Sequence, residues 1–173
     1  MTKNRSITKT AASSASARRV GCIIAAAVAV HLAGAPAHAS IYEFSLLAGD
    51  ASALDHTDGT GTNARFMNPT GVAVDGAGNI YVADSGNNNI RKISGGSVST
   101  LAGSTVGIAG STDGTGVAAL FNGPEGIAVD ATGNVYVSDT NNSTIRRITA
   151  GVVTTLAGAA GQTGGSDLSL IHI

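Results

Sequence analysis

Cysteine is almost absent from this chain of 173 residues, because its one copy, Cys22, lies in an N-terminal apolar segment. We expect that segment to be removed, which leaves no thiol and excludes disulfide bonds, cysteine-ligated zinc and thiol catalysis. Histidine is nearly as scarce, since His56 is the one copy between residues 40 and 167. Zinc catalysis needs several nitrogen or sulfur ligands, so His56 is expected to lie in a surface loop.

Basic residues are also few in the body of the chain. The first 39 residues hold half of the 10 Lys and Arg residues and none of the 11 acidic residues, which leaves the remainder with five basic residues and a net charge of −6. Binding to a phosphate backbone needs clustered Lys and Arg, so we predict no nucleic-acid partner. No Ser/His/Asp set, phosphate-binding glycine loop or amphipathic helix is visible, and we predict no cofactor and no metal site.

Residues 1–39 have the parts of a secretory signal peptide. A basic stretch ending in "ARR" precedes the apolar run "VGCIIAAAVAVHLAGA", and small residues at Ala37 and Ala39 predict cleavage between Ala39 and Ser40. A membrane-anchoring helix is the alternative, but the run is shorter than the roughly 20 residues that span a bilayer. We therefore expect a bacterial protein that is secreted or lies in the periplasm or cell envelope, without stable membrane insertion after cleavage.

The rest of the chain contains an internal repeat. "FMNPTGVAVDGAGNIYVADSGNNNIRKI" begins at Phe66, and "FNGPEGIAVDATGNVYVSDTNNSTIRRI" begins 55 residues later at Phe121. The motifs "TDGTG" at Thr57 and "VSTLAG" at Val98 recur at the same offset, the second as "VTTLAG". A match without gaps over several motifs indicates two copies of one structural unit.

Each unit has the pattern of short strands. Segments rich in β-branched and aromatic residues, such as "IYVAD" and "VYVSD", are separated by turns rich in Gly, Asn and Asp. This pattern predicts four strands per unit in an antiparallel meander, and an all-β fold. One such sheet cannot bury both of its faces, so the two units are expected to stack.

Regular spacing within the repeat singles out a set of turn residues. We interpret the aspartates as acceptors of backbone N–H bonds that hold the turns, and the glycines as sites of left-handed backbone. A ring of aspartates that binds a metal or a substrate is the less favoured alternative. The residues assigned to turns are Asp75, Gly78, Asn79, Asp84, Asp130, Gly133, Asn134 and Asp139.

The repeats resemble NHL repeats, which form the blades of a β-propeller, and specifically the bacterial secreted type with a "DGTG" arm between blades. The resemblance implies a partial β-propeller: two four-stranded blades plus an N-terminal closing strand, in a family whose rings usually have about six blades. The expected boundaries are 40–49 for the closing strand, 50–103 for blade 1 with its arm, and 104–158 for blade 2 with its arm.

The register of the repeat also predicts the segment after blade 2. Residues 159–167 match the start of a third repeat, and Asp167 takes the place of the aspartate in the next "DGTG". Residues 168–173, "LSLIHI", depart from the pattern and match the translation of a transposase adapter used in sequencing libraries. We therefore expect the chain to be an N-terminal fragment whose last six residues are an artefact. A natural apolar tail is the alternative.

Two further motifs have a structural and a functional interpretation. The "DGTG" segments, 58–61 and 113–116, hold one Asp among Gly and Thr, which favours a structured inter-blade loop over a calcium site. The motifs "IRKI" and "IRRI" recur in phase and contain Arg91, Lys92, Arg146 and Arg147, which indicates one arginine per blade that pairs with a nearby carboxylate or lines a rim.

Among function classes, binding is preferred: an exported propeller whose loops recognise a protein, a glycan or a small ligand, as a scaffold or sensor. Related propellers include lactonases and lyases with metal ligands around the central channel. Such ligands are expected to be polar residues that differ between otherwise matching positions of the repeat. Comparison of the two units identifies no such residue. The fragment is therefore expected not to be an enzyme. A structural repeat protein of the envelope is the third class.

Overall fold

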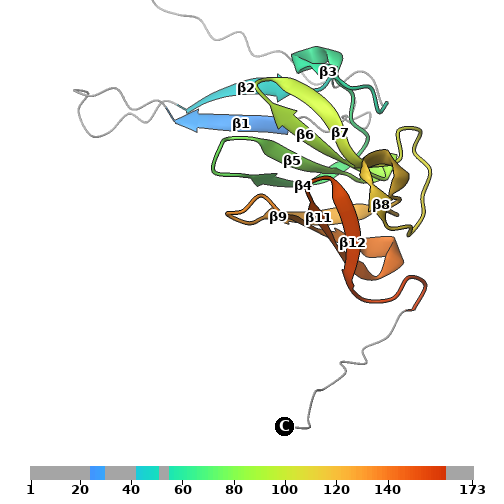
Figure 1. Cartoon of the computed structure of the whole chain (residues 1–173). Helices are drawn as coiled ribbons and strands as arrows, with labels where there is room; N and C mark the ends of the chain where they lie inside the picture. Colours follow the sequence, from blue (N-terminus) through green and yellow to red (C-terminus); the bar gives the residue numbers. More distant parts are fainter. Residues whose placement is uncertain (1–23, 30–41, 51–54, 163–173) are drawn as a thin grey trace, which may run out of the picture.

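The structure, a computed structural model, describes residues 24–29, 42–50 and 55–162. Within these ranges the chain forms β-strands and short 3-10 turns, and no α-helix. Two five-stranded antiparallel sheets lie one against the other, and a two-stranded ribbon of β1 and β2 covers the far side of the first sheet (Figure 1). The all-β fold and its division into two blades are confirmed.

Blade 1 has the strand order β3-β7-β6-β5-β4. Four of its strands are those that the sequence predicts, whereas the fifth, β3, comes from the "DGTG" arm, where Gly59 and Thr60 pair with Val98 and Ser97. The arm therefore runs along the outer edge of the blade. The bounds are β3 Gly59–Thr60, β4 Pro69–Val74, β5 Ile80–Asp84, β6 Asn89–Ser94 and β7 Ser97–Gly103.

Blade 2 repeats this topology in the order β8-β12-β11-β10-β9. The pairing of its third and fourth strands contains a bulge next to Ile145, and the same pairing in blade 1 contains one next to Ile90. The bounds are β8 Gly114–Thr115, β9 Pro124–Val129, β10 Val135–Asp139, β11 Thr144–Thr149 and β12 Val152–Ala157. The 3-10 turns are η1 Gly61–Asn63, η2 Ser85–Asn87, η3 Gly116–Ala118 and η4 Thr140–Asn142.

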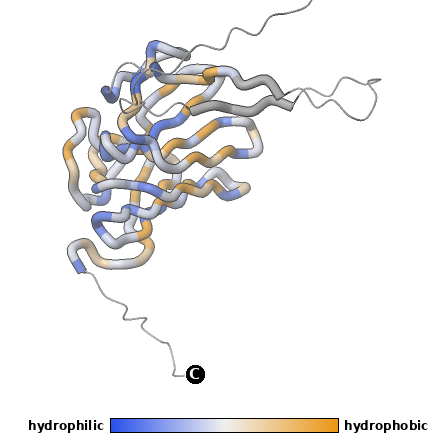
Figure 2. The backbone as a smooth tube through the Cα atoms, turned by 180° about the vertical axis from the view of Figure 1, so that it is seen from behind, coloured by the Kyte–Doolittle hydropathy of each residue, from blue (hydrophilic) through white to orange (hydrophobic). Residues whose placement is uncertain are grey.

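The alternation of side chains along the strands gives each blade two apolar faces. Apolar residues concentrate on the strands and polar residues on the turns at their ends (Figure 2). One face of blade 1 packs on blade 2 around Tyr81, Ile90, Phe121 and Val137. Successive side chains of a strand point to opposite faces, so Val82 and Ile93 lie on the other face of blade 1.

That other face of blade 1 is covered in part by the N-terminal ribbon, β1 Ile24–Ala29 and β2 Tyr42–Ala48. Leu47 and Ala48 of β2 pack on it. Leu101 and Ala102, the matching residues of β7, pack in the same way between blade 1 and blade 2. The strand predicted within residues 40–49 thus exists and stacks on blade 1 like the outer strand of a preceding blade. That it closes a ring stays a prediction.

Several sequence predictions fall on other parts of the chain. Most of the expected signal peptide and its cleavage site, Ala39 and Ser40, lie outside the described residues, although Ile24–Ala29 of its apolar run form β1. The expected adapter segment, 168–173, and the aspartate of the third arm, Asp167, also lie outside them.

Candidate functional site

The guanidinium of Arg91 in blade 1 is a large polar group with no solvent exposure. One terminal nitrogen lies 3.0 Å from Asp84 Oδ2, and the other lies 2.6 Å from Asp58 Oδ1 in the arm. The guanidinium also donates to the carbonyls of Arg65 and Thr57 and lies 5.0 Å from the centre of the Phe66 ring. One side chain therefore joins the arm, the loop before β4 and strands β5 and β6.

Blade 2 contains the same cluster around Arg146. Its terminal nitrogens lie 2.9 Å from Asp139 Oδ2 and 2.7 Å from Asp113 Oδ1, and the guanidinium lies 5.1 Å from the centre of the Phe121 ring. The same atoms donate to the carbonyls of Leu120 and Thr112. Of the two roles open to these arginines, the structure shows pairing with carboxylates. We call each cluster, Arg91 with Asp58 and Asp84 or Arg146 with Asp113 and Asp139, the arginine clamp.

The clamps perturb two of their carboxyl groups in opposite directions. Burial raises the pKa of Asp84, although hydrogen bonds from Asn87, Met67 and Arg91 act against it. Burial also tends to raise the pKa of Asp113, but there the hydrogen bonds from Thr155 and Arg146 outweigh it, and the pKa is lowered. A buried charge is stable only when it is paired, and each buried guanidinium here pairs with two carboxylates through its terminal nitrogens, while its Nε has no hydrogen-bond partner among the described atoms. We therefore interpret the clamp as structural.

The two aspartates at the ends of β5 and β10 reach beyond their own turns. Oδ1 of Asp84 accepts the backbone N–H of Met67, 17 residues upstream, at 2.7 Å, and Oδ1 of Asp139 accepts that of Asn122. The sequence predicts that each of these aspartates accepts backbone N–H groups of the Asn-rich turn that follows it. Only the side chains of Asn87 and Asn142 come from that turn, because the carboxylate points into the blade, toward the arginine.

The turns between the first two strands of each blade are held by Asp75 and Asp130. Asp75 Oδ1 accepts the N–H groups of Ala77 and Asn79, and its other oxygen accepts the Asn79 side chain and the Tyr81 hydroxyl. Asp130 does the same with Thr132, Asn134 and Tyr136, and gains the Thr132 hydroxyl. These hydrogen bonds lower the pKa of both aspartates. Gly78 and Gly133 have φ values of 82° and 85°.

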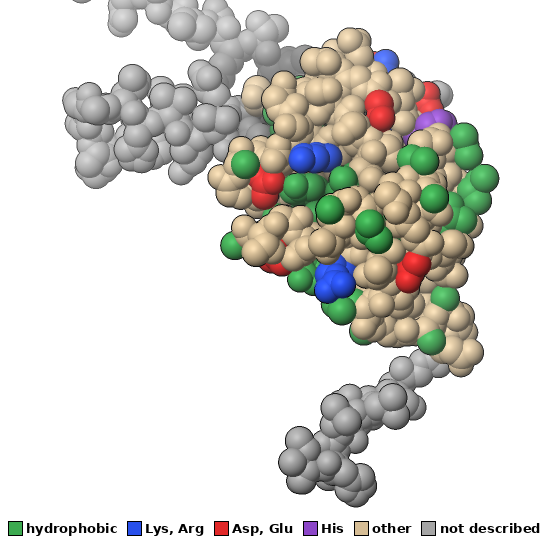
Figure 3. Space-filling view, viewed as in Figure 1, with side chains coloured by type: hydrophobic (Ala, Val, Ile, Leu, Met, Phe, Trp, Pro, Cys, Tyr) green, Lys and Arg blue, Asp and Glu red, His purple; other side chains and the backbone are tan. Residues whose placement is uncertain are grey.

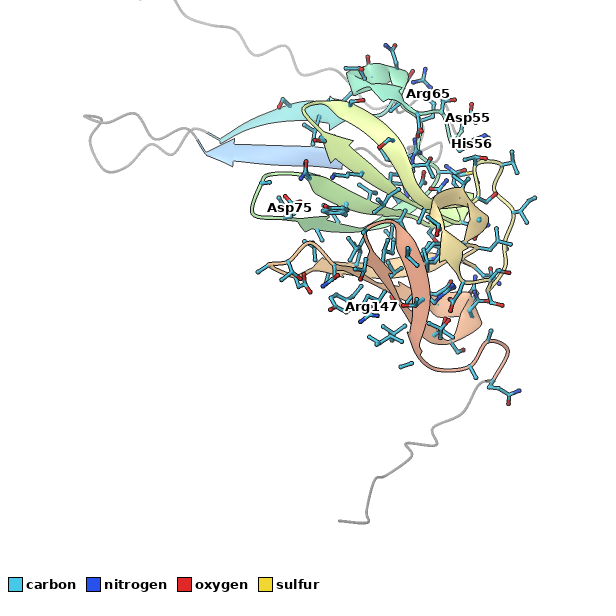
Figure 4. All side chains as sticks on the ribbon, viewed as in Figure 1. Asp55, His56, Arg65, Asp75 and Arg147 are labelled. Carbon is cyan, nitrogen blue, oxygen red and sulfur yellow. The ribbon has the colours of Figure 1, made fainter. Side chains whose placement is uncertain are left out.

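Groups that could hold a metal are not found in the described part of the chain, where no three His, Cys, Asp or Glu side chains cluster. His56 has 39% of its side chain exposed and its Nδ1 lies 3.0 Å from Asp55 (Figure 4). It therefore lies at the surface of a loop, as the sequence indicates. Within the same ranges, no helix has the length and apolar character that a membrane span requires.

One acidic side chain stands apart from this structural set. Glu125 is exposed on β9, the inner edge strand of blade 2, which lies beside the inner edge strand β4 of blade 1. Its counterpart is Thr70, whose hydroxyl lies 3.1 Å from the carbonyl of Glu125 and 3.2 Å from that of Pro124. Each described aspartate accepts a hydrogen bond or forms an ion pair. The carboxylate of Glu125, in contrast, accepts no hydrogen bond from any residue that the structure describes.

Sequence reasoning missed Glu125, because the two repeats were interpreted as free of polar breaks. The exchange of "PTG" for "PEG" was visible at the 55-residue offset. Its meaning depends on the inner position of the strand, which the sequence alone does not give. Thr70 and Glu125, on the two adjacent inner strands, form the candidate functional site.

Comparison with known proteins agrees with the two-blade architecture. The family model "NHL repeat" matches residues 66–93 and 121–148, which contain strands β4 to β6 and β9 to β11. These two blades are NHL repeats. The chain is 41% identical over 93 residues to Protein SUPPRESSOR OF QUENCHING 1 of Arabidopsis thaliana and 38% identical over 99 residues to NHL repeat-containing protein 2 of Bos taurus. These alignments cover 53% and 54% of the chain but 9% and 13% of those relatives.

Several solved structures have a similar fold. A Bacteroides thetaiotaomicron protein of unknown function aligns with a TM-score of 0.57 and 34% identity, over 61% of this chain and 27% of its own length. An auxiliary nutrient binding protein from the same organism aligns at 0.54 and 29%, and one from Bacteroides ovatus at 0.56 and 25%. The latter two alignments cover 65% and 68% of this chain and 28% and 30% of those proteins. The chain thus spans less than a third of the length of each of these proteins.

Proposed function

We propose that the protein is an exported NHL binding module, in which the inner strands β4 and β9 present the recognition site and Glu125 supplies its charge. The observation that carries the proposal is the free carboxylate of Glu125. The aspartates of the repeat are used to hold the blades, whereas this position changes from Thr to Glu and its carboxylate accepts no hydrogen bond from the described residues, although its carbonyl accepts one from Thr70. A carboxylate with two free oxygens accepts hydrogen bonds from hydroxyl, amide or ammonium groups.

Two further observations support this proposal. Two of the similar solved structures are auxiliary nutrient binding proteins, which favours a small ligand or a glycan over a protein partner. The residues at the N-terminus have the pattern of an export signal, which favours a secreted, periplasmic or envelope location. These two observations and the carboxylate of Glu125 are the reasons why we prefer binding to the alternatives, an enzyme of the lactonase or lyase type and a purely structural envelope protein.

The test is a binding screen of the purified chain against a panel of mono- and oligosaccharides, amino acids and polyamines, by calorimetry. Glu125→Gln keeps the shape of the side chain and removes its charge. For a ligand that binds the wild-type chain, this change is expected to weaken binding about tenfold or more, because hydrogen bonds to a charged group contribute about 1.5–3 kcal/mol.

The matched control is Val117→Thr, at a residue that is 56% exposed on η3, away from the inner strands. It is expected to leave the affinity unchanged. Equal affinity of the wild type and Glu125→Gln for every ligand in the panel would overturn the assignment of the site. Absence of any binding would overturn the proposal as a whole.

A further inference from the structure

The segment that carries the candidate site, Gly123 to Glu125, lies at the edge of its own sheet. β9 is the last strand in the order of blade 2, so one side of it has no partner strand among the described strands of that blade. Gly123 precedes β9 with a φ of 59°, which glycine adopts without strain, and Pro124 has no N–H group to donate. The free side of this segment therefore takes its partners from outside blade 2.

Blade 1 supplies these partners, because β4 and β9 lie side by side (Figure 1). The backbone N–H of Gly123 donates to Asn88 Oδ1 at 2.8 Å. The hydroxyl of Thr70 lies 3.2 Å and 3.1 Å from the carbonyl oxygens of the next two residues, the second of which is Glu125. A Cβ on Gly71 would clash with that same carbonyl of Glu125. Three consecutive residues of blade 2 are thus held by blade 1.

The side chain of Asn88 is itself fixed by both ends of its amide. It follows η2 with a φ of 54°, and its Nδ2 donates to the carbonyl of Gly107 at 2.9 Å. Gly107 lies in the loop after blade 1, where the hydroxyl of Ser104 accepts two backbone N–H groups. Because the carbonyl of Gly107 requires a donor and the N–H of Gly123 requires an acceptor, the amide has one orientation that satisfies both.

The repeat does not reproduce these contacts in its second copy. The residue of blade 2 at the position of Asn88 is Ser143, which has nearly the same φ, 55°, and a shorter side chain. Both residues donate their backbone N–H to the start of the preceding 3-10 turn, to Ser85 and Thr140 respectively. The turn therefore forms with either side chain, and the fold of the blade does not account for the amide of Asn88.

A fixed direction matters at this site because the surface offers little other charge. On the face shown in Figure 3, the Lys, Arg, Asp and Glu side chains of the described residues lie apart from one another, and no extended patch of one charge is visible among them. Recognition by a single carboxylate depends on the angle at which its oxygens meet the ligand, since hydrogen bonds weaken steeply when they are bent. A backbone held at three consecutive residues restricts that angle.

We propose that Asn88, together with Thr70, is a positioning residue for Glu125, so that blade 1 sets the direction in which blade 2 presents its carboxylate. Asn88 acts through the backbone of Gly123 and does not contact the ligand. The proposal rests on the function assigned to Glu125 above, because it describes how that site is oriented. The recognition site is then a property of two adjacent blades, and neither blade provides it alone.

Backbone order in the segment tests this positioning. In the 173-residue chain, ¹⁵N relaxation is expected to give order parameters of about 0.85 for Gly123 and Glu125, typical of a rigid backbone. Asn88→Gly suits the left-handed φ and removes the amide, so both order parameters are expected to fall, and the Gly123 N–H to exchange with solvent about fivefold faster or more. The matched control is Ser143→Gly, at the equivalent position of blade 2, which is expected to change neither residue.

Thr70 provides a second pair of variants. Thr70→Val keeps the shape of the side chain and removes its hydroxyl, so the order parameter of Glu125 is expected to fall. Thr70→Ser retains the hydroxyl and is expected to preserve the wild-type value. Thermal midpoints are measured for every variant, because a contact that only stabilises the fold would lower the midpoint without this local loss of order. Unchanged order parameters in both Asn88→Gly and Thr70→Val overturn the proposal.

Binding distinguishes the positioning role from the function itself. For a saccharide, amino acid or polyamine of the panel that loses affinity in Glu125→Gln, Asn88→Gly is expected to weaken binding about threefold or more, and to have no further effect in the double variant. The same loss from Asn88→Gly whether residue 125 is Glu or Gln overturns the positioning role and leaves the site assigned. No loss in Glu125→Gln overturns the proposed function, and the order parameters still decide whether blade 1 fixes the segment.

Discussion

Ile90 and Ile145 occupy the same position of the repeat, 55 residues apart, and their surroundings differ completely. Both lie on the third strand of a blade: Ile90 on the face of blade 1 that packs on blade 2, and Ile145 on the face of blade 2 that points away from blade 1. Ile90 is fully buried because blade 2 covers it, whereas 40% of Ile145 is exposed. The arginine clamps, in contrast, are the same in both blades to within 0.1 Å in their ion-pair distances. The ion pairs that hold a blade together thus lie within that blade, whereas the burial of its faces depends on the neighbouring blade.

The strongest test of internal assembly is to remove the clamps. Arg91→Leu and Arg146→Leu each leave a buried carboxylate without its cation, and each is expected to destabilise the fold by about 3–5 kcal/mol. The two losses should be similar, because each clamp is closed within one blade. Urea unfolding monitored by circular dichroism measures them, with Lys92→Leu as the control on the same strand. A loss below about 1 kcal/mol for either arginine would contradict the assignment of the clamp as structural.

The comparison of the two isoleucines predicts unequal losses of stability when each is replaced by alanine. Ile90→Ala leaves a cavity between the blades and is expected to cost about 2–5 kcal/mol. Ile145→Ala removes a side chain that is partly in water, so its cost is expected to be about 1 kcal/mol or less. The same unfolding experiment gives both values. Equal costs would mean that the outer face of blade 2 is covered in solution.

The inner strands give a third pair. A Cβ on Gly71 would clash with the carbonyl of Glu125 in the next blade, whereas a Cβ on Gly126 would meet the Ser138 hydroxyl at 2.8 Å. Backbone cannot move as easily as a hydroxyl that changes rotamer, so Gly71→Ala is expected to cost about 1–3 kcal/mol and Gly126→Ala less. If the order were reversed, the close approach of β4 and β9 would be in doubt. Denaturant midpoints of the two variants decide between these outcomes.

The smallest effect is expected from the turn aspartates. The pKa values of Asp75 and Asp130 are lowered from the ordinary 3.8 in the fold, so each contributes stability above that pH that is lost as the pH falls below it. Asp84 acts in the opposite direction, because its raised pKa favours the protonated form in the folded state. The Thr132 hydroxyl strengthens the turn of blade 2, where blade 1 has Ala77.

Substitution of each aspartate by asparagine measures the contribution of each turn to the acid sensitivity of the fold. Asp130→Asn is expected to flatten the fall of the thermal midpoint between about pH 5 and pH 2 more than Asp75→Asn does. Thr132→Ala is the control that should make the two turns alike. Parallel curves for the wild type and both Asn variants would show that these carboxylates do not contribute to the acid sensitivity of the fold.

Much of this architecture could be predicted from the sequence because the repeat is regular. The four meander strands of each blade and the turns at Asp75 and Asp130 follow from patterns that act over a few residues. The sequence left the role of the arginines open between pairing with a carboxylate and lining a rim, because Asp58 lies 33 residues from Arg91. The fifth strand, β3, did not follow, since it depends on pairing between residues far apart in the sequence, Gly59 and Val98. Glu125 was overlooked for a related reason: nothing local distinguishes an inner edge strand from any other strand.

The sequence by itself determined the all-β fold and the two copies of the NHL repeat, because strand alternation and turn chemistry are local and occur twice. Only the tertiary structure decided which hydrogen-bond and ion-pair partners the polar residues have. Asp84 accepts hydrogen bonds from Arg91 and Met67 as well as from Asn87 of its own turn, since a buried guanidinium needs a paired carboxylate. Tertiary contact also decided which copy of each apolar residue is buried. Ile90 and Ile145 are identical in sequence, and the blade that packs on one of them makes the difference.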